Sequence, residues 1–496
     1  MLLRWSKELE IKLDVGFEVK LKSKHSIDLS CLSGQSRKFA KFASVKTRKM
    51  ATILIKNGQL VNRGKIFTAD VFIRNGRIEQ IAGQIDRPAD TEINAEGKFV
   101  LPGIIDDQVH FREPGLTHKA EIYTESRAAV AGGVTSFMEM PNTKPPAVTQ
   151  DLLEQKYQRA AQVSLANYSF FMGTTNDNAD EALRTDLEKV CGIKIFMGSS
   201  TGKMLVDDER ALRKLFGESD LLIATHCEDE TRIEERLAMY QAKYGDDIPF
   251  QCHPEIRDAE VCRLSSSHAI DLAKELGTRL HILHISTAVE TDLFENKTPL
   301  EEKRITSEVC VHHLFFNDSW YAEKGSLIKC NPAIKSASDQ EALWAALSDD
   351  RFDVIATDHA PHTWEEKQGN YMQAPSGLPL VQHSLNLMMH FHQQGRISIE
   401  RIVEKMCHNP ARIFRMQERG YLDEGMWADV VIFDPNPEWE VNRAGLYYKC
   451  GWSPLEDFGF KGRVDSTIVS GHLAFHQGEL REGKSGERLL FRGFKR

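Results

Sequence analysis

The sequence lacks the cysteine pairs, the long apolar runs and the excess of positive charge that mark several protein classes. Its nine cysteines are an odd number and none forms a Cys-x-x-Cys pair, which argues against a disulfide framework and favours a reducing compartment. No stretch approaches the ~18 uncharged apolar residues of a membrane span. The net charge of −9 argues against a general nucleic-acid binder. We therefore expect a soluble cytoplasmic protein with no membrane and no nucleic-acid partner.

The first fifty residues differ from the rest of the chain in charge. They hold twelve Lys and Arg against five Asp and Glu, a net +7 that leaves −16 for the remainder. They show no clear periodicity and no compact apolar core of a secretory signal, and their acidic residues argue against a transit peptide. We predict that residues 1–50 are a disordered tail or a mis-called upstream start, with a basic targeting or docking arm as the alternative.

The remaining chain changes its hydrophobic rhythm twice. Short β-like runs surround Asn57-Gly58 and Asn75-Gly76, which are hairpin signals, and β-like runs return after about residue 415. In between, eight apolar runs alternate with helical lengths, beginning near residues 103, 133, 167, 192, 221, 280, 305 and 352. This pattern predicts an α/β fold: a (β/α)8 TIM-like barrel over 105–415 with a small composite β-sandwich domain built from 51–104 and 416–490.

Polar residues with the chemistry of metal ligands stand at the ends of several runs. The first ends in Gln108-Val109-His110, the fourth contains Lys194, the fifth and sixth end in His226 and His284, and the eighth ends in Asp358. A barrel gathers the carboxyl ends of its strands at one rim, where imidazole and carboxylate groups suit a divalent metal such as zinc. One buried histidine is usually a core residue, but three at strand ends with an aspartate indicate a site.

Seven motifs in a fixed order carry a specific resemblance. They are HFREPG (110–115), MPNT (140–143), KIFMGSSTG (194–202), HCED (226–229), HILHIST (281–287), NPAIK (331–335) and TDHAPH (357–362), followed by GYLDEGMWADVVIFD (420–434). From residue 51 to about 480 the chain resembles the cyclic amidohydrolase branch of the amidohydrolase superfamily, and within it the dihydroorotases. The resemblance implies reversible cyclisation of N-carbamoyl-L-aspartate to (S)-dihydroorotate plus water in de novo pyrimidine biosynthesis.

The resemblance also implies a binuclear metal centre with one or two Zn²⁺ per subunit. Its ligands would be His110 and Asp358 for one metal, His226 and His284 for the other, and carboxylated Lys194 as the bridge. The family usually has His-x-His after the first strand, whereas this chain has Gln108, a neutral and weaker ligand that puts the first metal in doubt. Hydroxide generated at the metal would attack the ring amide, with Asp358 as general base and then general acid.

A second set of residues carries the substrate assignment. Arg112 follows His110 by two positions, and its guanidinium suits bidentate capture of a carboxylate. By resemblance, the substrate-binding residues are Arg112, Asn142, Asn331, His362, Pro375, Ser376 and Gly377. Because hydantoinase and allantoinase rings carry no such carboxylate, Arg112 favours dihydroorotate.

Two alternatives stay open. The first is a dihydropyrimidinase-like or allantoinase-like cyclic amide hydrolase. The second is a catalytically silent dihydroorotase-like assembly partner, which Gln108 favours and the retained ligands oppose. The resemblance further implies a small-molecule substrate, a homo-oligomer and, as a candidate partner, aspartate transcarbamoylase. We interpret His281 as a packing residue, and His312 and His313 as structural residues or supports of the metal ligands.

Overall fold

The computed structural model describes residues 12–13, 17–18, 52–198, 204–483 and 486–493. Two compact units make up the chain, Met1–Lys49 and Met50–Arg496. In the first unit, β1 (Lys12–Leu13) and β2 (Phe17–Glu18) pair antiparallel. The prediction for residues 1–50 otherwise lies outside the described residues, as does the 199–202 part of the KIFMGSSTG motif.

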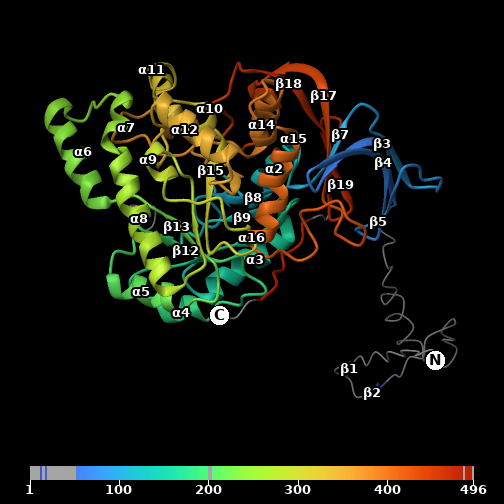
Figure 1. The fold of residues 1–496 in the computed structure, drawn as a ribbon, viewed down its shortest axis with the longest axis horizontal. Helices are drawn as coiled ribbons and strands as arrows, with labels where there is room; N and C mark the ends of the chain where they lie inside the picture. Colours follow the sequence, from blue (N-terminus) through green and yellow to red (C-terminus); the bar gives the residue numbers. More distant parts are fainter. Residues whose placement is uncertain (1–11, 14–16, 19–51, 199–203, 484–485, 494–496) are drawn as a thin grey trace, which may run out of the picture. The chain divides into compact units, whose positions relative to one another are not determined.

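The second unit contains a barrel of parallel strands (Figure 1). Its strands are β8 (Ile104–Val109), β9 (Val134–Glu139), β10 (Asn167–Phe170), β11 (Met172–Gly173), β12 (Ile193–Phe196), β13 (Ile223–His226), β14 (Leu280–Ile282), β15 (Ile305–Cys310) and β16 (Val354–Ala356). β10 and β11 occupy one position, interrupted at Phe171, and the ring closes where Val109 bridges His359 beyond β16. The eight positions coincide with the eight apolar runs, so the barrel prediction is confirmed.

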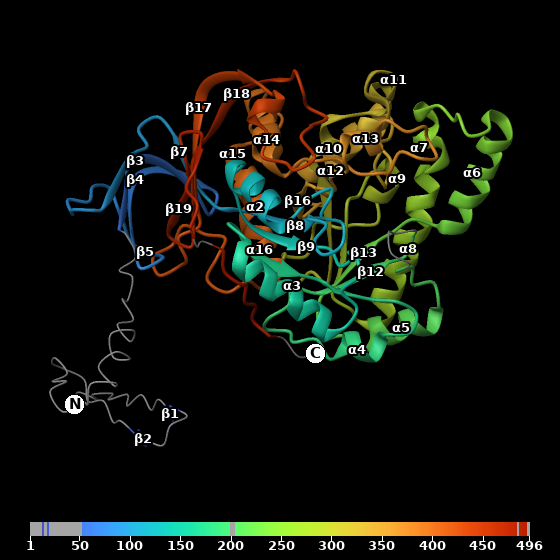
Figure 2. The same ribbon diagram turned by 180° about the vertical axis from the view of Figure 1, so that it is seen from behind.

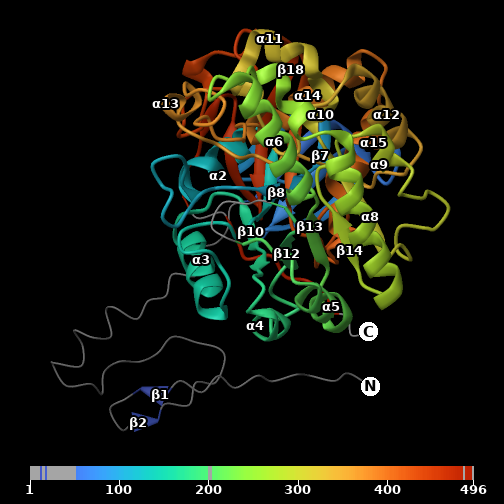
Figure 3. The same ribbon diagram turned by 90° about the vertical axis from the view of Figure 1, so that its left-hand side faces the viewer.

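Helices lie between the strands and surround them, as Figure 3 shows for α3, α5, α6 and α8. The helices are α2 (Ile122–Ala131), α3 (Gln150–Val163), α4 (Ala179–Leu183), α5 (Glu209–Glu218), α6 (Glu230–Tyr244), α7 (His253–Ile256), α8 (Ala259–Leu276), α9 (Ala288–Thr291), α10 (Val311–Phe315), α11 (Tyr321–Lys324), α12 (Ala337–Ser348), α13 (Trp364–Lys367), α14 (Ser384–Gln393), α15 (Ile399–Val403) and α16 (Asn409–Ile413). Sequence sets their ends: Asp258 accepts the Val261 N–H to begin α8, and Gly277 at φ +66° ends it.

A nine-stranded sheet joins the two flanks of the barrel. The first flank supplies β3 (Ile53–Asn62), β4 (Lys65–Arg74), β5 (Arg77–Ala82), β6 (Thr91–Asn94) and β7 (Phe99–Pro102), and the second supplies β17 (Val430–Glu440), β18 (Gly459–Val469), β19 (His472–His476) and β20 (Glu479–Leu480). β7 pairs antiparallel with β17, placing Leu101 opposite Val431, and Figure 2 shows these distant segments side by side. The fold-class prediction is confirmed, while the domain limits at 104 and 416 stay a proposal.

One of the two predicted hairpin turns is wrong. Asn75-Gly76 joins β4 to β5 as expected, but Asn57-Gly58 lies inside β3. The Asp70 carboxylate accepts the Asn57 N–H at 2.8 Å, and the strand register shifts between Ile55 and Gly58. Asn57 therefore uses its positive φ of 60° in a β-bulge rather than a turn.

No helix within the described ranges has both the length and the apolar character needed to cross a bilayer.

Candidate active site

A cavity of about 380 Å³ lies at the carboxyl ends of the barrel strands. All thirteen residues that the sequence assigns to metal or substrate line it: Gln108, His110, Arg112, Asn142, Lys194, His226, His284, Asn331, Asp358, His362, Pro375, Ser376 and Gly377. Phe196, Arg257 and Ala360 line it as well. The fold thus brings the predicted residues into one place, while their individual roles stay predictions.

Three of the lining residues have unusual backbone conformations. Arg112 (φ 69°), His284 (φ 40°) and Asp358 (φ 46°) each lie a few residues past the end of a barrel strand. Side chains other than glycine rarely adopt positive φ, and the backbone strain must be offset by the surrounding structure. Such strained residues cluster at functional sites, so their position at three strand ends indicates one here.

His110 and Asp358 form the first pair of predicted ligands. His110 Nε2 lies 3.1 Å from Asp358 Oδ1, and His110 Nδ1 lies 2.8 Å from Asn142 Oδ1. Burial lowers the pKa of His110, which favours the neutral ring. When Nδ1–H donates to Asn142, the Nε2 lone pair faces the carboxylate of Asp358. Two facing acceptors need a shared proton or a shared cation, so this pair fits a metal.

Lys194, His226 and His284 form the second group. His226 Nδ1 lies 2.9 Å from His284 Nε2, whereas Lys194 Nζ and His284 Nδ1 have no hydrogen-bond partner among the described residues. Unsatisfied buried polar atoms are costly. Burial lowers the pKa of Lys194 to about 7, so much of the amine is neutral near pH 7 and able to take up carbon dioxide. The donors fit a zinc-class ion.

Gln108 has a different partner from its neighbours in the cavity. Its side chain is buried, and its Oε1 accepts a hydrogen bond from Cys310 Sγ at 3.8 Å. The amide is therefore engaged with a thiol at the end of β15, and its role as a metal ligand stays a prediction.

Arg112 provides a buried positive charge in the cavity wall. Its Nε donates to the Pro361 carbonyl at 3.1 Å, and its Nη2 lies 3.1 Å from His362 Nε2. His362 in turn contacts Lys119 Nζ at 2.9 Å and the Ser376 carbonyl at 2.9 Å. Burial lowers the pKa of Arg112 to about 10, which still leaves it cationic near neutral pH. A fixed cation of this kind suits an anionic substrate group.

Arg257 is a cavity residue that sequence reasoning did not assign. It forms a buried ion pair with Glu228. Burial raises the pKa of the Glu228 carboxyl, but Arg257 and His226 outweigh burial and lower this pKa to about 2. The motif around Arg257, HPEIRDAE (253–260), does not by itself reveal this role, because the partner Glu228 lies 29 residues earlier in the chain, just after β13.

Comparison with known proteins agrees with this geometry. The family model "Amidohydrolase family" matches residues 99–474. Dihydroorotases from Halobacterium salinarum and Pyrococcus abyssi are 33% and 32% identical to the chain; the alignments cover 78% and 89% of this chain and 89% and 99% of those proteins. The chain belongs to the amidohydrolase family. This amidohydrolase also resembles an L-hydantoinase (dihydropyrimidinase) from Arthrobacter aurescens, with TM-score 0.84, 27% identity and coverage of 89% and 100%.

A buried ion-paired network lies beneath the site of this amidohydrolase. His281 Nε2 lies 3.4 Å from Asp107 Oδ2 and 3.3 Å from Glu308 Oε2, and all three side chains are inaccessible to solvent. Burial lowers the pKa of the His281 ring, but Asp107 and Glu308 outweigh burial and raise this pKa to about 9. The other Glu308 oxygen accepts the backbone N–H of His284 at 3.0 Å. His281 is therefore a charged link beneath His284 rather than the packing residue expected from sequence.

We expect His281→Asn to lower the free energy of unfolding by about 3–5 kcal/mol, because it removes the cation paired with buried Asp107 and Glu308. Burial and Asp107 raise the pKa of Glu308 to about 8, so the lost pairing is mainly that of His281 with the Asp107 carboxylate. Urea unfolding measures the change. His268→Asn is the control, since the His268 side chain is 48% exposed and exposed substitutions stay within about 0.5 kcal/mol. Equal midpoints for the two variants would contradict the ion-pair assignment.

Proposed function

We propose that this amidohydrolase is a dihydroorotase, which interconverts N-carbamoyl-L-aspartate and (S)-dihydroorotate in pyrimidine biosynthesis. The observation that carries the proposal is the shared cavity of Arg112 and the buried donors His110, His226, His284 and Asp358. Hydrolysis of a cyclic amide needs these four side chains as metal ligands. Recognition of a ring that bears a carboxylate needs the positive charge of Arg112. The relatives named dihydroorotase support the same conclusion.

The proposed metal centre follows the two groups of donors. His110 with Asp358, and His226 with His284, would each hold one Zn²⁺, and Lys194 would bridge the two as a carbamate. A lysine cation cannot ligate a metal, whereas the carbamate formed from its neutral amine is a carboxylate on a long stem. When bound, the metals would lower the pKa of a water molecule and polarise the ring carbonyl.

The chain's own residues would bind the ring and move the proton. Arg112, Asn142 and His362 would hold the exocyclic carboxylate, while Asn331, Pro375, Ser376 and Gly377 would line the ring. During ring opening, Asp358 accepts a proton from water as the C–O bond forms. It then gives that proton to the ring nitrogen as the C–N bond breaks. Ring closure runs through the same positions in reverse.

Hydantoinase-like hydrolysis is the second candidate, and the similarity to the Arthrobacter aurescens L-hydantoinase favours it. Hydantoin and dihydrouracil rings carry no carboxylate for Arg112 to hold, so the buried guanidinium would be left without a substrate partner. We therefore place this candidate behind dihydroorotase. A cytoplasmic homo-oligomer that associates with aspartate transcarbamoylase remains part of the proposal.

Metal content and dihydroorotate ring opening, measured on one sample purified without chelators, test the function. We expect activity together with about two equivalents of zinc bound at the catalytic donors, or about one equivalent there if Gln108 weakens the first metal site. Lys194→Ala is the control, because it removes the bridge and is expected to lose the catalytic metal together with activity. Folded wild-type protein that stays metal-free and inactive in excess zinc would overturn the proposal and favour the silent assembly partner.

A further inference from the structure

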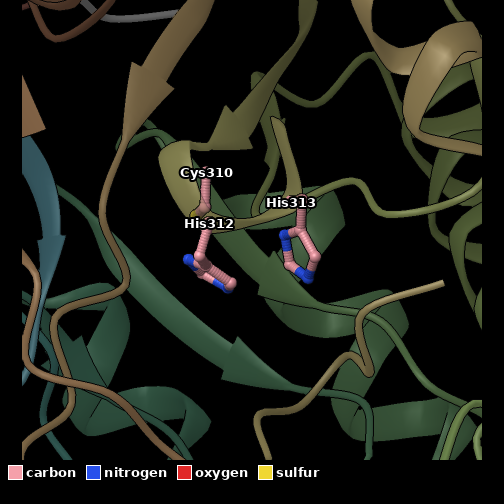
Figure 4. A group of neighbouring side chains, drawn as sticks. All are labelled: Cys310, His312 and His313. Atoms are coloured by element: carbon pink, nitrogen blue, oxygen red, sulfur yellow. The ribbon is translucent and has the colours of Figure 1, made fainter. Parts of the chain in front are cut away.

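A second cluster of metal-type ligands lies where β15 passes into α10. Cys310, His312 and His313 are all buried, and one ligand atom from each lies within 4.8 Å of the others. Figure 4 shows both imidazole rings extending from the start of α10 beside the end of the strand that carries Cys310. The two ring centroids are 4.1 Å apart. None of the three residues is a predicted ligand of the catalytic metals.

A hydrogen bond at one ring nitrogen of His313 leaves the other ring nitrogen available to a metal. Its Nε2 lies 3.2 Å from the Pro332 carbonyl oxygen, which can only accept, so Nε2 carries the hydrogen. Nδ1 is then a bare lone pair, and it has no partner among the described residues. Metal-bound histidines in proteins usually donate their other ring N–H to a backbone carbonyl or a carboxylate in this way.

His312 and Cys310 supply two further donors. His312 is about 1% exposed, and neither of its ring nitrogens makes a well-formed hydrogen bond within the described part of the chain. Among the residues that the structure describes, Cys310 Sγ donates to the amide oxygen of Gln108 at 3.8 Å. A buried imidazole whose ring nitrogens make no well-formed hydrogen bond is costly in a dry interior. A cation bound beside it would remove that cost.

We propose that Cys310, His312 and His313 bind a zinc-class divalent metal ion, separate from the catalytic pair, with the Gln108 amide oxygen beside it. One thiolate and two imidazoles are ligands that zinc prefers. Bonds of about 2.0–2.3 Å to zinc place tetrahedral ligand atoms roughly 3.5 Å apart. The present ligand atoms lie within 4.8 Å of one another, and rotation of the side chains would bring them to this separation. The thiol proton leaves to solvent as the metal binds.

This site also gives Gln108 a physical role. The family's usual imidazole at this position would serve a catalytic metal, whereas the amide oxygen of Gln108 is turned to Cys310. Gln108, which replaces the family's usual histidine, and the Cys310, His312 and His313 cluster would then surround the same metal ion.

Cobalt substitution of the full-length protein tests the proposal, because thiolate-to-cobalt charge transfer absorbs in the near ultraviolet. The predicted catalytic ligands contain no sulfur, so such absorption reports a cysteine site. We expect wild-type protein, stripped of metal and titrated with Co²⁺, to develop this absorption. We expect it to bind one more equivalent of Co²⁺ than Cys310→Ser. His312→Asn and His313→Asn should weaken that binding by about tenfold or more.

Cys227→Ser is the matched control, since Cys227 is also a buried thiol and stands next to the predicted ligand His226. It should keep both the absorption and the extra equivalent. Wild-type protein without thiolate absorption at saturating Co²⁺ would overturn the proposal, and so would absorption that survives Cys310→Ser. If Cys310→Ser does not fold, the wild-type spectrum and the two histidine variants decide the question.

Discussion

Asp358→Asn lowers kcat for ring opening of dihydroorotate by about 10²–10⁴-fold, the range that general acid–base groups supply. Asparagine has nearly the same shape as aspartate, but it cannot take up and release a proton. Asp358 Oδ1 lies 3.1 Å from His110 Nε2 in the cavity wall, so the substitution removes a charge with little change of shape. Steady-state kinetics measures kcat, and zinc analysis of the same sample shows whether metal is retained.

Asp353→Asn is the matched control for this substitution. Asp353 is a buried aspartate at the opposite end of the same strand, where it pairs with Lys303 at 2.9 Å. Its loss should lower stability while kcat stays within about threefold, because it lies outside the cavity. A metal-loaded Asp358→Asn variant with wild-type kcat would refute the proton-transfer role. Loss of metal together with kcat would instead assign Asp358 mainly to metal binding.

Arg112→Ala lowers kcat/KM for dihydroorotate by about 10²–10⁴-fold, because two charge-assisted hydrogen bonds of roughly 1.5–3 kcal/mol each are lost. Dihydrouracil, the same ring without the carboxylate, should change little. The variant therefore loses the discrimination between the two rings, and kcat/KM for each substrate measures it. Arg112→Lys keeps the charge without the planar fork and should fall between the wild type and the alanine variant.

Arg159→Ala serves as the control for loss of an arginine near the same motif. Its side chain is 43% exposed and pairs with Glu113 at 2.7 Å, outside the cavity. It should leave the ratio of the two substrates unchanged. Equal losses on dihydroorotate and dihydrouracil in Arg112→Ala would contradict the carboxylate clamp and favour a hydantoinase-like reaction.

The parts of the fold that sequence could predict are those set by local patterns. The eight apolar runs mark the eight barrel positions because buried parallel strands are continuously hydrophobic. Asn75-Gly76 forms a turn because Asn-Gly favours a tight turn and a strand lies on each side of it. Asn57-Gly58 has the same local signal, but Asp70, thirteen residues away, captures the Asn57 N–H and converts the site into a bulge. Long-range contacts of this kind have no local signature.

The residues of the cavity likewise divide into those that local sequence patterns could predict and those that they could not. Single residues at strand ends could be selected from motifs, because the barrel places every strand end at one rim. Pairings between residues that are distant in the sequence could not. Asp107 with His281 and Glu308, and Cys310 with Gln108, join different barrel strands, and Arg257 reaches back 29 residues to Glu228. These partners are known only once the fold is known.

The pairing of β7 with β17 has a consequence for synthesis of the chain. Leu101 and Val431 are neighbours in one sheet, so the strands made first wait on the ribosome until more than three hundred further residues have emerged. Such late, non-local pairing is slow, and unpaired strand edges are sites of aggregation. We expect nascent chains that end before β17 to depend on chaperones, and the full chain to become independent of them once β17 and β18 are released.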